Sequence, residues 1–161
     1  MATPTNLPAS FVTGAVLTAA QQNDLRGAFR ILQVLQDTTT TVQSSSSGTY
    51  ADTDLSITIT PQSTSNKILA VFAGVSFSNS TGTEGACNIV RTSTQISEIV
   101  GLSYNSAGNA IGSPIMVVLD SPATTSAITY KVQFKRFGGA GSFLLAPNNS
   151  FCSFTLLEVS A

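Results

Sequence analysis

Hydrophobic and polar residues alternate over much of the chain after residue 50, which is the pattern of a half-buried β-strand. In the run LSITIT, Leu55, Ile57 and Ile59 share one face, and the residues between them are Ser or Thr. The run 126–137 repeats this pattern over a greater length, with Ile128, Tyr130, Val132 and Phe134 alternating with Thr129, Lys131, Gln133 and Lys135. Both runs predict antiparallel strands that cover a core with one face.

The run KILAVFAGVSFS, residues 67–78, departs from simple alternation because both of its faces are apolar. Leu69, Val71 and Val75 lie on one face, and the other carries Ile68, Ala70 and Phe72. A strand that is apolar on both faces either lies centrally between layers or faces a subunit contact.

Further short strands are predicted at 86–93, 95–101, 114–120 and 150–159, and Gly, Pro, Asn and Ser separate them. Seven or eight short strands of this kind indicate an all-β protein built as an antiparallel sandwich. We expect a jelly-roll-like topology, because a jelly roll arranges eight strands in two sheets. The polar connector 38–50 leads into this predicted β-sandwich domain, which spans residues 37–161.

Residues 18–36, TAAQQNDLRGAFRILQVLQ, have helical rather than strand periodicity, and they predict one short α-helix. Thr18 and Gln21 form a capping box at its start. The apolar residues that follow have the three- and four-residue spacing of a short coiled coil. One interpretation, which we favour, is that copies of the chain associate through this stripe. The alternative is a helix packed on its own β-domain. The predicted oligomer interface consists of Leu25, Ala28, Phe29, Leu32 and Leu35.

Residues 1–17 contain Pro4, Pro8 and Gly14, which predict an extended arm with no core of its own. Several of its side chains are too apolar for a free tail, so we expect another protein to cover them. The predicted anchoring residues are Leu7, Phe11, Val12, Val16 and Leu17.

Charged residues make up only 9% of the 161 residues, against about 25% in an ordinary domain. The polar surface must therefore consist largely of hydroxyls and amides, and such a surface suits a permanently assembled protein. The net charge is −1 and no basic run occurs, so we expect no nucleic-acid partner. No apolar run reaches the ~20 residues that a bilayer requires, so we expect no membrane partner.

The chain has no histidine, which excludes Ser-His-Asp and Cys-His catalytic arrangements. Asp52 and Asp54 are the one close pair of acids, and we interpret them as part of a turn rather than as a cation site. The run GGAGS, residues 138–142, lacks the lysine of a phosphate-binding loop and predicts a flexible connection. We therefore expect no enzymatic activity, no cofactor and no metal.

Two cysteines, Cys87 and Cys152, lie in separate strand-like runs and match no metal or redox spacing. Free, buried thiols are the interpretation that we favour, because free cysteine is among the most buried residue types. A disulfide between the two is the alternative.

The opening PTNLPASFVTGAVLTAAQQNDLRGAFRILQV resembles the N-terminal segment of small tailed-bacteriophage virion proteins, in which an extended arm leads into a short helix. Four later phrases resemble the jelly-roll heads of phage fibre and decoration proteins: SITITPQSTSNKILAVF, CNIVRTSTQI, LDSPATTSAITYKVQFKR and FTLLEV. The resemblance implies a non-enzymatic virion component, usually trimeric, that is attached by its N-terminal part. It brings no catalytic residues with it.

Together these features predict a homotrimeric capsid decoration (cement) or short head-fibre protein on the virion surface, assembled in the host cytoplasm. Its partners would be its own copies and the major capsid or tail protein of the virion. The alternative is a short tail fibre or receptor-binding tip that recognises a host surface receptor through loops 79–85, 103–113 or 138–150. A host lectin-like adhesion domain is a third possibility.

Overall fold

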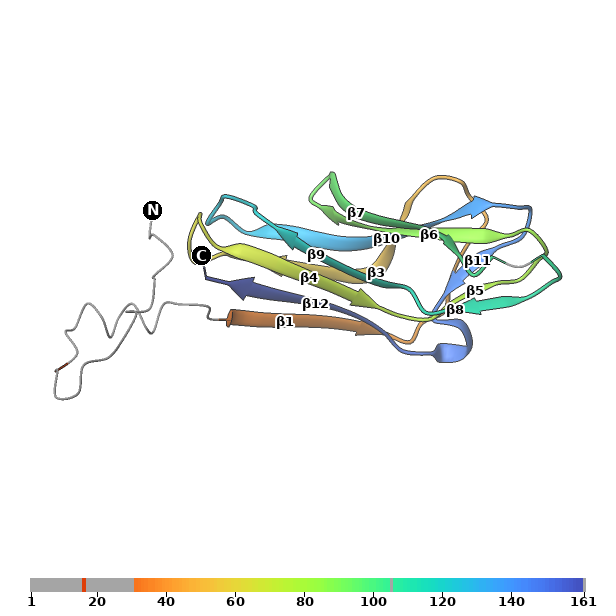
Figure 1. The fold of residues 1–161 in the computed structure, drawn as a ribbon, viewed down its shortest axis with the longest axis horizontal. Coiled ribbons are helices and arrows are strands. Elements are labelled where there is room, and N and C mark those ends of the chain that lie inside the picture. The colour runs from red at the N-terminus through yellow and green to blue at the C-terminus, as the bar shows by residue number, and fades with distance from the viewer. Residues whose placement is uncertain (1–15, 17–30, 105, 161) are drawn as a thin grey trace.

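The computed structural model describes residues 16, 31–104 and 106–160, and Figure 1 shows them almost entirely as β-strands. The mainly β prediction is confirmed. The strands are β1 (Ile31–Thr39), β2 (Gln43–Ser45), β3 (Ala51–Ile59), β4 (Lys67–Ala73), β5 (Ser76–Ser78), β6 (Glu84–Arg91), β7 (Thr94–Leu102), β8 (Ala110–Gly112), β9 (Ile115–Asp120), β10 (Ile128–Gly138), β11 (Phe143–Leu145) and β12 (Cys152–Val159). A short 3-10 helix, Pro147–Asn149, separates β11 from β12.

The strands form three antiparallel four-stranded sheets, with the orders β1-β12-β4-β9, β3-β10-β6-β7 and β2-β11-β5-β8. The third sheet continues the first, because each of its strands precedes or follows a strand of the first sheet after a gap of two to six residues. Hydrogen bonds partly bridge the gap: the Gly74 amide donates to the Pro114 carbonyl at 3.1 Å, and the Ala146 amide donates to the Val75 carbonyl at 3.0 Å. When the strands are joined across these gaps, the described residues form eight long strands, and Figure 1 shows that they lie in two layers.

One hydrophobic core fills the space between the two layers. The apolar residues of the alternating runs point into this core as predicted from the sequence, and Leu55, Ile59 and Tyr130 are almost completely buried. The third sheet joins the same core through Phe143, whose ring lies 6.4 Å from that of Phe134. Gly85 permits this approach, because a Cβ at that position would lie 2.1 Å from the Phe143 ring.

The predicted helix is wrong over residues 31–36, which form most of β1. This strand pairs with β12 from Ile31 opposite Val159 to Thr39 opposite Cys152, with a register shift between Ile31 and Gln33 that leaves Leu32 without a partner in the ladder. A long-range ladder thus replaces the local helical hydrogen bonds that the spacing of Leu32 and Leu35 predicted. Residues 18–30, the rest of the predicted helix, lie outside the described residues.

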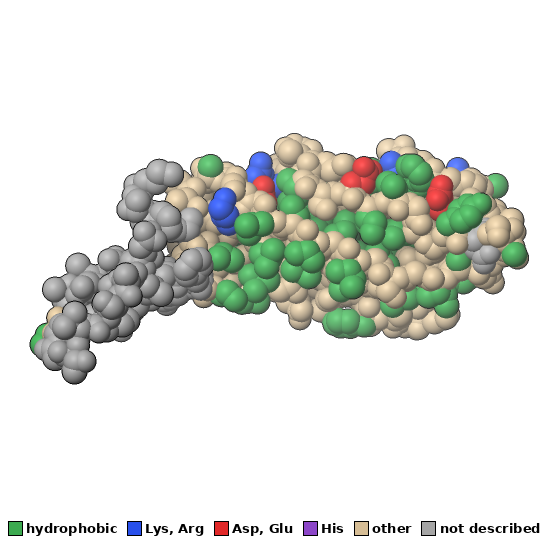
Figure 2. All heavy atoms as spheres, in the orientation of Figure 1, with side chains coloured by type: hydrophobic (Ala, Val, Ile, Leu, Met, Phe, Trp, Pro, Cys, Tyr) green, Lys and Arg blue, Asp and Glu red, His purple; other side chains and the backbone are tan. Residues whose placement is uncertain are grey.

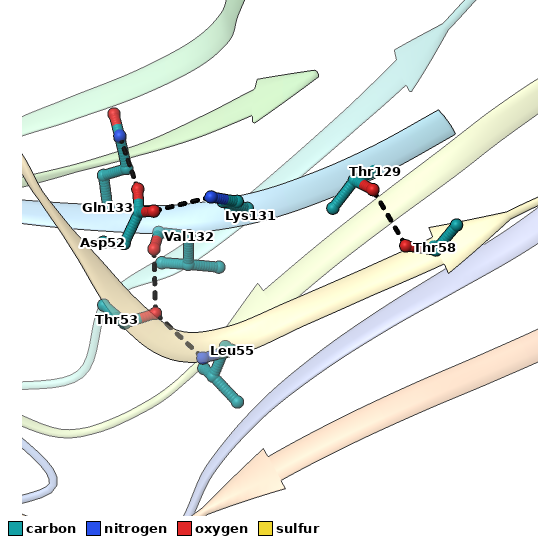
Figure 3. A network of polar contacts seen from close by, with 8 residues as sticks. All are labelled: Asp52, Thr53, Leu55, Thr58, Thr129, Lys131, Val132 and Gln133. Atoms are coloured by element: carbon teal, nitrogen blue, oxygen red, sulfur yellow. Dashed lines mark hydrogen bonds and ion pairs between the residues drawn. The ribbon is translucent and has the colours of Figure 1, made fainter. Parts of the chain in front are cut away.

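Asp52, Thr53 and Asp54 do not form the predicted turn but lie inside β3. The register of the ladder between β3 and β10 shifts here. Lys131 pairs with Ser56 and Gln133 pairs with Asp52, so a step of two residues along β10 corresponds to a step of four residues along β3. Figure 3 shows the hydrogen bonds that the Thr53 side chain makes at this register shift. Its buried hydroxyl donates to the Val132 carbonyl at 2.8 Å and accepts from the Leu55 amide at 3.1 Å. One side chain thus satisfies two backbone groups that the irregular ladder leaves unpaired.

Replacing Thr53 with valine keeps the shape of the side chain but removes its hydroxyl. We expect Thr53→Val to lower the free energy of unfolding by about 2 kcal/mol, because a buried amide and a buried carbonyl both lose their partner. Urea denaturation followed by circular dichroism measures the change.

The matched control is Thr58→Val in the same strand, where the lost hydroxyl bonds the exposed Thr129 hydroxyl at 2.8 Å. Because water replaces that partner, we expect the control to change stability by less than ~0.5 kcal/mol. Equal effects of the two substitutions would contradict the bridging role of Thr53.

Candidate assembly surface

The outward side chains of the sheet β1-β12-β4-β9 lie in rows that the ladder register defines. The first row is wholly aliphatic and consists of Leu119, Leu69, Leu157 and Val34. The second row consists of Val117, Val71, Thr155 and Gln36. The third row consists of Ile115, Ala73, Ser153 and Thr38. Every outward position in these rows is apolar on β9 and β4, whereas β12 and β1 contribute hydroxyls and an amide as well.

We call the aliphatic part of these rows the apolar face; it comprises Val34, Leu69, Val71, Ala73, Ile115, Val117, Leu119 and Leu157. Its outermost side chains are more than half exposed: Ile115 by 62%, Val117 by 61%, Val34 by 57% and Leu119 by 54%. In the view of Figure 2, hydrophobic side chains gather over this sheet, and the acidic side chains lie towards its upper margin. A contiguous exposed apolar patch on a soluble domain commonly marks an interaction site.

Among the described strands of this sheet, the outward side carries one charge, that of Lys67 at the start of β4. The acids on the same strands point the other way. Asp37 accepts from the Ser56 amide of the opposite layer, and Glu158 is completely buried. The outer side of the opposite layer is different, because Asp52 and Lys131 form an ion pair there at 2.6 Å. The two outer faces of the sandwich therefore differ sharply in charge.

The doubly apolar strand predicted from residues 67–78 accounts for the centre of the apolar face. Its inner residues Ile68, Ala70 and Phe72 are completely buried in the core. Its outer residues Leu69 and Val71 are half-buried, since neighbouring side chains of β9 and β12 cover only their flanks. The strand is thus central within its sheet, but no described segment covers its outer side.

The apolar surface continues beyond the gap onto the third sheet, where Leu144 and Phe77 lie side by side and Ile111 is 73% exposed. These three side chains, with Val42 and the 3-10 turn, line a hollow of about 280 Å³. The turn holds Asn148 and Asn149 in the left-handed region, with φ of 53° and 58°. The lining of the hollow is therefore apolar except for the two asparagines of the turn.

A buried carboxylate ties together the end of the sandwich where β1 begins. The Glu158 carboxylate accepts hydrogen bonds from the Gln33 amide at 2.5 Å, the Asn66 amide at 2.5 Å and the Gln62 backbone N–H at 2.7 Å. Burial by itself raises the pKa of Glu158, but these three donors outweigh it, and the pKa lies below its usual value. The group is therefore a structural anion, held by β1 and by the turn between β3 and β4.

A second polar cluster joins the two layers at the end of β9. Asp120 accepts from the Arg91 guanidinium at 2.8 Å and from the Tyr130 hydroxyl at 2.6 Å. Burial, followed by the Asp120 carboxylate, raises the pKa of the Tyr130 phenol. The phenol thus stays protonated and donates to Asp120. The cluster therefore links β9 in one layer to β6 and β10 in the other.

On the outer side of the sheet β3-β10-β6-β7, Tyr50 donates to Glu98 at 2.5 Å. The Lys135 ammonium lies 4.1 Å from the centre of the Tyr50 ring. Burial and the nearby carboxylate raise the pKa of Tyr50. Asp52 accepts from Lys131 and from the Gln133 amide, and these bonds lower its pKa (Figure 3). Each of these surface contacts joins two side chains of the same chain.

Cys87 and Cys152 are both free and buried, as the favoured interpretation of the sequence predicted. Burial raises the pKa of the Cys87 thiol, which therefore stays protonated. Within the part of the chain that the structure describes, no three His, Cys, Asp or Glu side chains are grouped so that they could hold a metal ion. The same residues include no helix long and apolar enough to span a membrane.

The structure places only some of the residues predicted for assembly. Leu35 packs against the core of its own chain from β1, and Leu32 is half-buried in the same strand, so these two do not form a helical stripe. Val16 is 90% exposed. The remaining predicted interface and anchoring residues lie outside the described residues, namely Leu7, Phe11, Val12, Leu17, Leu25, Ala28 and Phe29.

Two of the loops predicted for recognition lie against each other at the end of the molecule formed by the third sheet. The Ser142 amide donates to the Asn79 side chain at 2.7 Å, and the Gly141 amide donates to the Thr83 hydroxyl at 2.9 Å. Gly139 adopts a left-handed φ of 74°, and a Cβ there would lie 2.4 Å from the Gly82 carbonyl oxygen. The predicted flexible connection 138–142 is therefore a closely packed turn.

Comparisons with known proteins give little beyond this geometry. No family model and no curated protein matches the chain. A solved structure described as that of infectious bursal disease virus, Gx strain, is similar to it with 15% sequence identity and a TM-score of 0.40. The similarity covers 81% of this chain and 39% of the matched chain, so this protein spans about two fifths of that chain's length.

The lowered pKa of Glu158 predicts how stability depends on pH. Because the pKa is lower in the folded than in the unfolded chain, the carboxylate stabilises the fold above the unfolded value and loses this effect as the pH falls through the folded value. We expect Glu158→Gln to cost about 2 kcal/mol at pH 7, since the negative charge is lost and an NH₂ group, which cannot accept, replaces an oxygen that accepts one or two of the three hydrogen bonds.

Unfolding in urea at pH 7 and at pH 3 measures this effect. The difference between Glu158→Gln and the unaltered chain should shrink at pH 3, where the carboxyl takes up a proton in the unfolded chain. Glu98→Gln at the exposed Tyr50 contact is the control, for which we expect a change below ~0.5 kcal/mol at pH 7. A Glu158→Gln difference that is the same at both pH values would rule out this linkage.

Proposed function

We propose that this protein is a non-enzymatic structural component of a tailed-bacteriophage virion. In its specific form, the proposal is a homotrimeric capsid decoration (cement) or short head-fibre protein, attached to the virion surface through its N-terminal arm and the segment that follows. The observation that carries the proposal is the apolar face, an uncharged, exposed aliphatic surface on a small domain.

The order of the strands supports a jelly-roll assignment, which the resemblance to phage decoration and fibre heads implies. Joined across their gaps, the strands form eight long strands in two sheets, ordered 1-8-3-6 and 2-7-4-5. This arrangement results when an eight-stranded antiparallel ribbon is rolled into two Greek keys, as in viral capsid domains. The fold alone also serves lectins and enzymes, so the function has to rest on the surface and not on the topology.

The internal pairing of ionisable groups supports a structural rather than a catalytic function. Glu158, Asp120 and Asp52 each accept two or more hydrogen bonds from neighbouring side chains or backbone. The thiol of Cys87 is buried and protonated. A general base or nucleophile needs a free, activated group within reach of a substrate, and these groups are engaged in holding the sandwich together.

A specific observation favours the receptor-binding tip as the second candidate. The packed loops 79–83 and 139–142 lie at the end of the molecule opposite to the start of β1, as Figure 1 shows. A domain attached through its N-terminal segment would therefore present these loops away from the attachment point. Copy number separates the two candidates, since a decoration protein is present in hundreds of copies per particle and a tail tip in tens at most.

Deleting residues 1–17 tests the attachment. We expect the shortened chain to bind purified particles that lack this protein with an occupancy at least tenfold lower, because the apolar arm residues supply the contact. Quantitative mass spectrometry of washed particles measures the occupancy. An exchange of Leu7, Phe11 and Val12 for serine in the full-length chain serves as a matched variant with unchanged length. Undiminished occupancy of both variants would end the proposed anchoring role.

A further inference from the structure

We propose that the apolar face docks a second copy of the same chain, so that copies meet through the sheet β1-β12-β4-β9. This inference rests on the proposed function and deepens it, because it names the surface that joins the copies. The sequence alone placed that contact on a helical stripe, two of whose residues, Leu32 and Leu35, now lie in β1.

The extent of the apolar face fits a subunit contact. Burying a whole aliphatic side chain contributes about 1.5–3 kcal/mol at about 25 cal/mol per Å², so a fully exposed side chain presents about 60–120 Å² of apolar surface. Of the eight residues of the face and Phe77, Leu144 and Ile111 on the continuation of the sheet, five side chains are more than half exposed and the other six are half-buried, so together they expose on the order of 300–500 Å² of apolar surface. A stable interface of standard size buries about 800 Å² on each partner, of which about 60% is apolar, so the apolar face approaches the apolar share of such an interface.

The absence of charge on the described part of this face restricts the occupant. A partner with charged side chains would lose their hydration on docking, and the face offers no opposite charge in return except Lys67 at its margin. The occupant must therefore present an uncharged apolar surface of similar extent. The chain itself carries such a surface, and symmetric oligomers are built from surfaces that complement their own copies.

The arrangement of polar groups on the same sheet also fits self-association. In the second and third rows, beside the aliphatic residues of β9 and β4, the outer positions of β12 and β1 are hydroxyls and an amide, and Gln36 donates to the Thr155 hydroxyl at 3.0 Å. These groups form one margin of the apolar face. An apolar centre with a hydrogen-bonding, uncharged margin is the anatomy of a permanent subunit interface.

The test compares the full-length chain with Val117→Lys, which places a charge at the centre of β9. Light scattering coupled to size exclusion, over a concentration series, gives the mass and the dissociation constant. We expect the unaltered chain to have the mass of an oligomer at micromolar concentration. We expect Val117→Lys to raise the dissociation constant about a hundredfold, because the ammonium group would be buried without a partner.

Two further variants keep the result interpretable. Val117→Thr retains the β-branched shape and strand preference, and we expect it to raise the dissociation constant about tenfold. Thr58→Lys introduces the same charge at an exposed outward position of β3, in the opposite layer, and should leave the mass unchanged. Thermal unfolding and circular dichroism verify that each variant is folded, and if Val117→Lys does not fold, Val117→Thr decides.

The possible failures are distinguishable. Oligomers of unchanged stability in both Val117 variants would overturn the inference, and the proposed function would stand if Leu25→Lys then separated the copies. A monomeric unaltered chain at tens of micromolar would overturn the inference together with the homotrimer, while attachment to particles would remain a separate measurement.

Discussion

The two-residue period of β4 is the constraint on which the rest of the structure depends. This strand pairs with β12 on one side and β9 on the other, and its inner residues Ile68, Ala70 and Phe72 are completely buried. Once those three are fixed on the core, Leu69 and Val71 must point outward, since a shift of one residue would exchange the two faces. The same ladder register then places the outward residues of β9 and β12 beside them.

Two acidic side chains of the chain, Glu158 and Asp120, hold parts of the sandwich together. Glu158 and Asp120 lie at places where separate strands or turns must be held together, and each accepts hydrogen bonds from groups far away in the sequence. Because a buried acceptor without its donor is costly, such clusters specify one arrangement of the strand ends. Apart from Lys67, the described outer side of the first layer carries no charge, so the low charge content of the sequence results in a difference in charge between the two outer faces.

The strands and the core were predictable from the sequence where the pattern is local. The alternation around Leu55 and Tyr130 gave the correct inward faces, and the doubly apolar run 67–78 correctly indicated an unusual strand. The helix prediction failed over residues 31–36 because ILQVLQ fits a helical period as well as a strand with a register shift, which occurs between Ile31 and Gln33. Pairing with β12 makes this segment a strand and not a helix. Because β12 lies more than a hundred residues later in the chain, the local sequence around residues 31–36 does not indicate this pairing.

The polar clusters were less accessible to prediction for the same reason. Glu158 in FTLLEV occupies an inward position by strict alternation, yet its donors come from Gln33, Gln62 and Asn66 in separate segments. The irregularity at Thr53 appears in the sequence only as a polar residue between two acids, which is also the composition of a turn. The apolar face had a visible signal in the runs KILAVF and IMVVL, but only the ladder register shows that they lie side by side.

The pairing of Ile31 with Val159 brings the entry and the exit of the β-domain to the same point. A domain whose ends meet in this way can be transplanted into a loop of another protein through two short linkers, because the recipient backbone needs to open only by the spacing of two neighbouring strands. Cargo genetically fused after β12 would emerge beside the start of β1, whereas a peptide inserted in the 79–83 turn would be displayed at the opposite end of the molecule.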